Sequence, residues 1–469
     1  MTEHSAANST GAHAVNSGSP IAYDFIEQIK DSIDAGVPGT VRSQAVALLR
    51  DTVAVGIAGA STAESQRVRE LLTHWGGPSE AAIWGGGPLL GVGGAAFVNA
   101  HQVHTLEWDP IHEPGVVHAM SVVTPCVMAW AQSMTRRGEV VSGQHIVNGI
   151  LAGVDMAAGL GVVTNSPLRF FRPATNGGMG AVVGVGVAAG WSSEKILAAL
   201  GIVYGGISGT MQPHTEGAQV LALQVGFNAR AAMNAIDLAD AGFQGPRFIL
   251  EGTYGYYNLI ETDGDPGQLA ANKAAHWEIT RVGIKPFPSG RATHGALGGI
   301  LDLQHTHGFT RSDISRVDIA VPSMVRGLVG RRPTADMPVG AARLCLAYLV
   351  PCLLDDGTIN MDTYQPERIT NPDILAWSER VSVVADDNPD PNAFNPQRIV
   401  ITLNSGDTIT ADIPGSLGSP ESPLSPEQSR KKFDDAMAIG GRADYAEALH
   451  AIISDIDNLA DVADLWDVL

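Results

Sequence analysis

Apolar residues recur at three- and four-residue spacing through the first half of the chain, from Ile21 to about Asp240. Residues 21–33, 40–60 and 194–209 are clear examples, and Gly or Pro closes most of these segments. One face of an α-helix repeats about every 3.6 residues, so this spacing predicts a succession of helices with at least one buried face each.

The pattern changes near residue 277. Three segments then alternate apolar and polar positions and are rich in Val, Ile and Thr: residues 314–324, 379–387 and 397–414. A period of two is typical of a half-buried strand, so these segments predict strands, and the NSGD sequence inside the last one predicts a hairpin turn. Helical spacing returns between the strands and again beyond residue 415.

These changes predict a mainly α protein, in which a large all-helical domain carries an inserted α+β domain. The expected divisions are a disordered tail (1–19), the helical domain (20–276), the α+β domain (277–415) and a C-terminal return to the helical domain (416–469). The final segment is too short to build a core of its own, so it should pack against the first helices.

Composition and charge narrow the class of protein. Hydrophobic residues make up 45% and charged residues 17% of the 469 positions, which is typical of a globular chain. The 29 Lys and Arg residues face 49 Asp and Glu residues, for a net charge of −20. Nucleic acids and anionic membranes attract positive proteins, so neither is an expected partner.

The three cysteines, Cys126, Cys345 and Cys352, are far apart and form no CxxC motif. This pattern supports neither a disulfide framework nor a zinc ribbon, and a reducing cytoplasm is the expected location. The first 19 residues have no signal-peptide pattern, and apolar runs such as residues 181–191 are too short to span a bilayer.

Six titratable residues crowd into the stretch HTLEWDPIHEPGVVHAM, residues 104–120: His104, Glu107, Asp109, His112, Glu113 and His118. Histidines titrate near neutral pH, and neighbouring carboxylates orient and tune them, so the stretch is a candidate for acid–base chemistry. No HExxH spacing occurs here. A metal site from His112, Glu113 and His118, and a solvated loop between two helices, are the alternatives.

Two further segments bring cations to predicted helix starts. Lys285 and Arg291 flank a Pro-X-Pro turn before His294, which predicts either an anion site or a surface turn. Arg172 precedes a glycine-rich helix start and is a candidate carboxylate ligand. The glycines themselves favour close packing of helices.

Taken in order, these segments resemble the MmgE/PrpD family along nearly the whole chain. The segment KPFPSGRATHGAL (285–297) resembles the family's KPYPxCRxxHxAI and is the most specific short match. Residues 99–131 resemble the segment NGxxxHxxDFDDTH followed by HPSxxxxPAxLAxAE. The resemblance implies a helical domain with an inserted lid, a site in the cleft between them, a homodimer, and dehydratase or decarboxylase chemistry without a metal or organic cofactor.

The resemblance assigns roles residue by residue. Six residues stand at or near family site positions: Glu107, Asp109, His118, Lys285, Arg291 and His294. Four others replace a family site residue: Ile111 a Thr, Arg172 a His, Leu221 a Lys and Gln224 a His. An amine at position 221 would contact a substrate carboxylate and leucine does not. We therefore expect a less acidic substrate than methylcitrate or cis-aconitate and a more apolar pocket, with Leu221, Ile111 and Phe227 in it.

The expected activity is that of a hydro-lyase acting at carbon adjacent to a carboxylate or carbonyl of a small organic acid. The expected catalytic residues are His118 as base or acid, Asp109 and Glu107 beside it, and His294 from the lid. The expected substrate contacts are Arg172, Lys285, Arg291, His112, Leu221 and Gln224. Epimerase, isomerase or decarboxylase activity, a non-catalytic binding protein, and a metal-dependent lyase using His112 and His118 are the alternatives.

Overall fold

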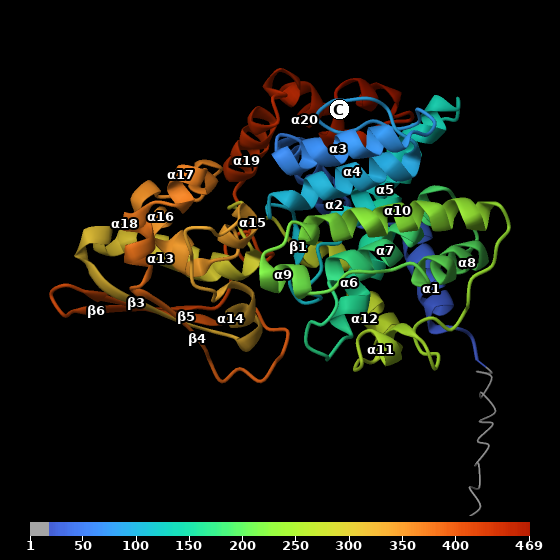
Figure 1. Cartoon of the computed structure of the whole chain (residues 1–469). Helices are drawn as coiled ribbons and strands as arrows, with labels where there is room; N and C mark the ends of the chain where they lie inside the picture. Colours follow the sequence, from blue (N-terminus) through green and yellow to red (C-terminus); the bar gives the residue numbers. More distant parts are fainter. Residues whose placement is uncertain (1–17) are drawn as a thin grey trace, which may run out of the picture.

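The computed structural model describes residues 18–469, and residues 1–17, most of the expected tail, lie outside the described residues. The protein is mainly α-helical: a large helical domain lies beside a smaller α+β lid, and α19 connects the two along one edge (Figure 1). The helices before the lid are α1 Ile21–Asp34, α2 Gly39–Gly59, α3 Ala63–Trp75, α4 Val92–Thr105, α5 Met120–Arg136, α6 Gly143–Val162, α7 Arg172–Ala188, α8 Ser193–Tyr204, α9 Gln212–Glu216, α10 Val220–Asp240, α11 Tyr256–Leu259 and α12 Leu269–Ala275.

Glycines let the two central helices of this domain, α6 and α7, approach each other closely. A Cβ atom at Gly180 of α7 would lie 2.4 Å from the backbone oxygen of Gly153 on α6, and one at Gly184 would lie 2.7 Å from that of Gly149. Only a residue without a side chain fits at such a distance. The prediction that these glycines serve helix packing is confirmed, and the contact places the start of α7 beside the cleft.

The helix α6 is apolar enough, over 20 residues, to cross a bilayer by length and composition, contrary to the expectation that no apolar run is long enough. The bent pair α2 and α3 passes the same test, with an angle of 88° between the two helices. However, 83% of the apolar window of α6 is buried inside the protein. A helix apolar all round is also what the core of a large globular domain requires.

The lid contains a four-stranded sheet in the order β4-β3-β5-β6, in which only β3 and β4 are parallel. The predicted strands and the turn at residues 404–407 are confirmed. Its elements are α13 His294–His307, β3 Ile314–Val321, α14 Ser323–Val329, α15 Val339–Ala342, α16 Leu346–Asp356, α17 Pro366–Ile369, α18 Pro372–Ser378, β4 Val381–Ala385, β5 Gln397–Leu403 and β6 Thr408–Ile413. The buried side chains of the lid form a second hydrophobic core, separate from that of the helical domain.

The C-terminal helices, α19 Pro426–Ile439 and α20 Ala446–Ser454, pack against the helical domain, and their side chains join its core. The ammonium group of Lys432 on α19 donates hydrogen bonds to Asp51 on α2 (2.9 Å) and to the backbone oxygen of Trp108 (2.9 Å). Short 3-10 turns lie at Pro266–Gln268, Glu278–Arg281, Arg291–Thr293, Arg311–Asp313, Asp362–Tyr364, Ala443–Tyr445, Ile456–Asn458 and Ala463–Asp467.

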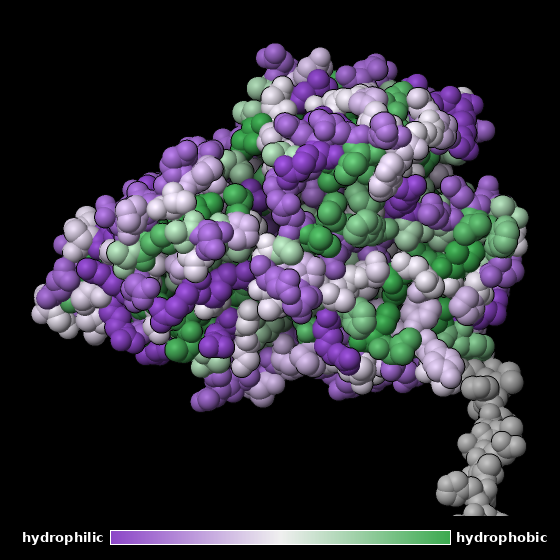
Figure 2. All heavy atoms as spheres, in the orientation of Figure 1, coloured by the Kyte–Doolittle hydropathy of each residue, from purple (hydrophilic) through white to green (hydrophobic). Residues whose placement is uncertain are grey.

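Hydrophilic residues cover most of the lid on the face shown in Figure 2, whereas apolar patches are scattered over the helical domain. Phe227 belongs to the exposed apolar residues, with 45% of its surface accessible. The expectation that Phe227 contributes to an apolar pocket is therefore wrong, because its side chain faces outward.

Candidate active site

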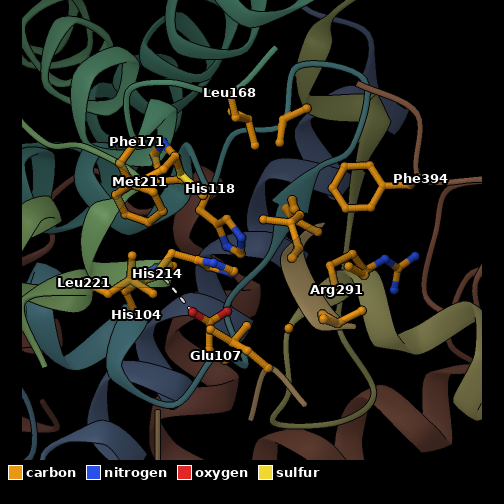
Figure 3. A pocket seen from close by; sticks show the side chains of 18 residues that line it. His104, Glu107, His118, Leu168, Phe171, Met211, His214, Leu221, Arg291 and Phe394 are labelled. Carbon is orange, nitrogen blue, oxygen red and sulfur yellow. Dashed lines mark ion pairs between the residues drawn. The ribbon is translucent and has the colours of Figure 1, made fainter. Parts of the chain in front are cut away.

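A cavity of about 70 Å³ lies between the helical domain and the lid (Figure 3). We call it the inner chamber. Its polar lining consists of His104, Glu107, His118, His214 and Arg291, and the rest of the wall is apolar. The apolar residues are Ile111, Val116, Leu168, Phe171, Pro173, Met211, Leu221, Ala292, Leu328, Val329, Leu344 and Phe394, together with Gly290.

The carboxylate of Asp109 is the centre of the polar group at the wall of this chamber. It is fully buried, and its Oδ2 atom faces the Nδ1 atoms of His104 (2.8 Å) and His118 (2.9 Å). The hydroxyl of Ser121 donates to the same oxygen. The segment around it, residues 106–112, is buried as well, so the alternative of a solvated interhelical loop is wrong.

The two histidines that share Asp109 titrate in opposite directions. Burial lowers the pKa of His104, but the Asp109 and Glu107 carboxylates outweigh burial, and the pKa is raised above its usual 6.5. Burial also lowers the pKa of His118, and here, with the Lys285 ammonium group, it outweighs Asp109, so the pKa falls below 6.5. Compared with a free imidazole, His104 is thus shifted toward the imidazolium form and His118 toward the neutral form, the order that an acid and a base require.

Lys285 is fully buried beneath these groups. Its ammonium group donates to the backbone oxygen (3.0 Å) and the Oε2 atom (3.2 Å) of Glu107 and lies 3.6 Å from Oδ1 of Asp109. Burial raises the pKa of the Glu107 carboxyl, but Lys285 and His104 outweigh it, and the net shift is downward. Lys285 does not line the inner chamber, so it stabilises the carboxylates around the site.

The backbone around Asp109 is held in an uncommon conformation. Glu107 and Val116 both have φ near +53°, and both line the inner chamber. A left-handed conformation costs about 1–3 kcal/mol outside glycine and is found where surrounding structure imposes it. The imposing contacts come from the strand pair β1 (Ile111–His112) and β2 (Val282–Gly283) and from the close approach of Gly115 to α6.

Several predicted site residues do not reach the inner chamber. The Nε2 atom of His112 faces Glu278 at 2.8 Å, and its Nδ1 accepts the amide hydrogen of Gly115 at 3.0 Å. The amide group of Gln224 binds the backbone of Thr210 at both ends. His294 faces Ser289 through Nε2. These residues hold neighbouring segments in place.

The two arginines predicted to bind substrate are both engaged by protein groups. Arg172 is fully buried, where it donates to both carboxylate oxygens of Glu261 (2.8 and 3.1 Å) and to Asn392 of the lid (3.0 Å), and it does not line the chamber. Arg291 does line the chamber, and its Nε atom donates to Glu113 at 2.6 Å. The segment that contains Arg291 is buried, so the alternative of a surface turn is wrong.

Two histidines of the chamber had no predicted role. His104 lies in the crowded stretch, at the C-terminal end of α4, where the helix dipole favours a cation. Its place in this stretch, at the end of a predicted helix, could have indicated from the sequence that His104 belongs to the site. His214 lies on the short helix α9, and burial lowers its pKa to about 4. No neighbouring sequence pattern marks His214, because only the fold brings it to the cavity.

His104, Asp109 and His118 also have the donor types and spacing of a metal site. Their hydrogen bonds argue against that use, because both Nδ1 atoms and the Ser121 hydroxyl already converge on one Asp109 oxygen. The Lys285 ammonium group near the other oxygen would repel a cation. The expected alternative of a metal held by His112 and His118 has less support, since His112 bonds to Glu278.

Sequence comparison places these features in a known family. The MmgE/PrpD N-terminal domain matches residues 28–269, and the MmgE/PrpD C-terminal domain matches residues 287–458. The chain belongs to the MmgE/PrpD family. A cis-aconitate decarboxylase from Aspergillus terreus is 22% identical over 455 residues, and a cis-aconitate decarboxylase-like protein from Aspergillus oryzae is 21% identical over 469 residues. The first alignment covers 92% of this chain and 92% of the Aspergillus terreus protein. The second covers 94% of this chain and 95% of the Aspergillus oryzae protein.

Membership of the MmgE/PrpD family supports a dehydratase- or decarboxylase-type role for this protein, because the relatives that it resembles are enzymes of this kind. At 22% identity the substrate can differ from that of the relatives. The substrate and the reaction are therefore inferred from the residues that line the cavity.

Proposed function

We propose that this MmgE/PrpD protein is a lyase, and first a hydro-lyase, that removes a proton from carbon adjacent to a carboxylate or carbonyl without a metal or organic cofactor. One observation carries the proposal: two histidines share one buried carboxylate beside an apolar chamber, and their pKa values shift in opposite directions. A homodimer in the cytoplasm is part of the same proposal and follows from the family resemblance and the separate cysteines.

In this mechanism neutral His118 is the base. Asp109 accepts the Nδ1 hydrogen of His118, which leaves the Nε2 lone pair free to take the substrate proton. The electron pair of the broken C–H bond moves onto the carbonyl oxygen as an enolate. Loss of hydroxide from the next carbon, with a proton from the His104 imidazolium, then forms the double bond and releases water.

The same groups support the alternative reactions. Return of the proton to the other face of the enolate gives an epimer or isomer. If a carboxylate leaves as carbon dioxide instead, its bonding electrons form the carbanion, and an acid in the site protonates it. The apolar wall favours all three reactions, because an enolate-like charge interacts more strongly with His104 where water is excluded.

The test is carbon–deuterium exchange followed by NMR, with purified protein in D₂O and a panel of short- and medium-chain acids, hydroxy acids and unsaturated acids. We expect deuterium at the carbon adjacent to the carboxylate, or dehydration or decarboxylation, for at least one member. His118→Ala should reduce the rate by about 10²- to 10⁴-fold. The matched control is His305→Ala, since His305 is exposed on α13.

An unchanged rate in His118→Ala would remove His118 from the mechanism. If no acid in the panel reacts but some raise the melting temperature of the protein, the non-catalytic alternative is favoured. Leucine at position 221, where the family carries lysine, is the observation behind that alternative.

A further inference from the structure

A second cavity, of about 530 Å³, adjoins the inner chamber on the side of α3 and α10. We call it the outer chamber. Four residues line both cavities: His104, Glu107, Leu221 and Leu344. A ligand that occupies both would therefore pass the candidate catalytic histidines.

Arg343 of the lid is the one arginine or lysine that lines the outer chamber, and its partners do not neutralise it. The side chain is 6% exposed, and its Nη1 atom donates to the backbone oxygen of Thr105 at 2.6 Å. The guanidinium carbon lies 5.0 Å from the ring centre of Tyr364. Its Nε atom is buried without a hydrogen-bond partner, and no carboxylate in residues 18–469 forms an ion pair with it.

This situation differs from that of the other cations at the cleft. Arg291 pairs with Glu113 and Lys285 pairs with Glu107, so neither has its charge free for a ligand. Two acidic residues line the outer chamber: Glu107 pairs with Lys285, and Glu64 already binds Arg67 and Gln219. A buried charge without a counterion is costly, which suggests that an anion supplied from outside completes the site.

We propose that Arg343 binds the carboxylate of the substrate in the outer chamber, while an apolar remainder extends into the inner chamber. The substrate class is thus an acid with one carboxylate and an apolar body. The statement that this acid is a substrate rests on the proposed function. The statement that Arg343 binds a carboxylate does not. Leu221 lies at the border of the two chambers, where a family lysine would supply a second cation, so the proposal favours monocarboxylates over di- and tricarboxylates.

Isothermal titration with octanoate and octanamide tests the site without any reaction. The two probes differ in charge and hardly in shape. We expect octanoate to bind the wild-type protein and Arg343→Met to weaken it about tenfold or more, since a charge-assisted contact is lost. Octanamide should bind both proteins equally. Arg332→Met is the matched control, because Arg332 is an exposed lid arginine paired with Glu379.

Equal affinity of octanoate for the wild type and Arg343→Met would overturn the proposal, and so would tighter binding of succinate than of octanoate. If Arg343→Met does not fold, the two probes are compared on the wild-type protein alone. The proposal then requires octanamide to bind at least about tenfold more weakly than octanoate, and equal affinities would overturn it. Arg343-dependent octanoate binding without deuterium exchange in any acid would support this site and contradict the proposed lyase. Deuterium exchange into an acid at the same rate in the wild type and in Arg343→Met would support the proposed lyase and contradict the Arg343 site.

Discussion

At the scale of single residues, one carboxylate gives two identical side chains different chemistry. His104 and His118 both contact Oδ2 of Asp109, but His104 also faces Glu107 at 3.6 Å. Burial and Lys285 lower the pKa of both rings, and the carboxylates outweigh them only at His104. The sum of these interactions gives His104 the higher pKa of the two rings. The residue type does not determine this difference, because both side chains are imidazoles.

The pH dependence of kcat/KM should report this difference. His118 must be neutral, and its pKa lies below 6.5, so activity should fall on the acid side only below that pH. His104 must be protonated, and its pKa lies above 6.5, so activity should fall on the alkaline side above that pH. Asp109→Asn removes the charge that raises the pKa of His104, so the alkaline limb should move to lower pH.

The same variant should lose about 10²- to 10⁴-fold in kcat/KM, because Asp109 also fixes the histidine tautomers. The measurement is a pH profile of both proteins with the acid that exchanges fastest. A lower rate with both limbs unmoved would mean that Asp109 has only a structural role.

At the scale of elements, close contact between α6 and α7 positions the start of α7 at the cleft. Phe171, which immediately precedes this helix, is part of the chamber wall. The sequence predicted this packing well, because small residues at helical spacing have few other uses. It did not predict that Arg172, on the first turn, would turn away from the chamber to Glu261.

Gly180→Ala should therefore lower the free energy of unfolding. Its Cβ atom would lie 2.4 Å from the oxygen of Gly153 and 2.7 Å from the Cβ of Ala157, and overpacking of this kind costs about 1–3 kcal/mol. Gly298→Ala on α13 is the matched control, since nothing lies within 4 Å of its Cβ position. Better helix propensity should make that variant up to about 1 kcal/mol more stable. Urea unfolding of both variants checks the difference, and equal stability would contradict the packing argument.

At the scale of the whole molecule, the inner chamber has walls from both the helical domain and the lid, so it exists only because the two are bound together. Arg291 of the lid pairs with Glu113, Arg172 donates to Asn392 of the lid, and Arg343 donates to Thr105. The three bonds join residues 178, 220 and 238 positions apart, and each is partly buried. Together they hold the lid against the helical domain.

Glu113→Gln should loosen the lid, because it leaves the Arg291 guanidinium buried with a weaker, neutral partner. We expect faster amide hydrogen exchange, by mass spectrometry, in residues 285–297 and in the 388–396 loop. Exchange in α6 and α7 should not change. Glu379→Gln breaks the exposed pair with Arg332 and serves as control, with no expected effect. Uniform acceleration across both domains in Glu113→Gln would instead indicate global destabilisation.

The sequence by itself determined the class of fold, the position of the strands and the stretch that contains most of the candidate catalytic residues. These depend on local periodicity and on residues close in the chain, such as His104, Asp109 and His118. Only the tertiary structure decided which charged residues face the cavity. Arg172 meets Glu261 89 positions away, and Lys285 meets Glu107 178 positions away. Burial makes an unpaired charge costly, so such distant partners, invisible in local sequence, neutralise Arg172 and Lys285 and leave Arg343 for a ligand.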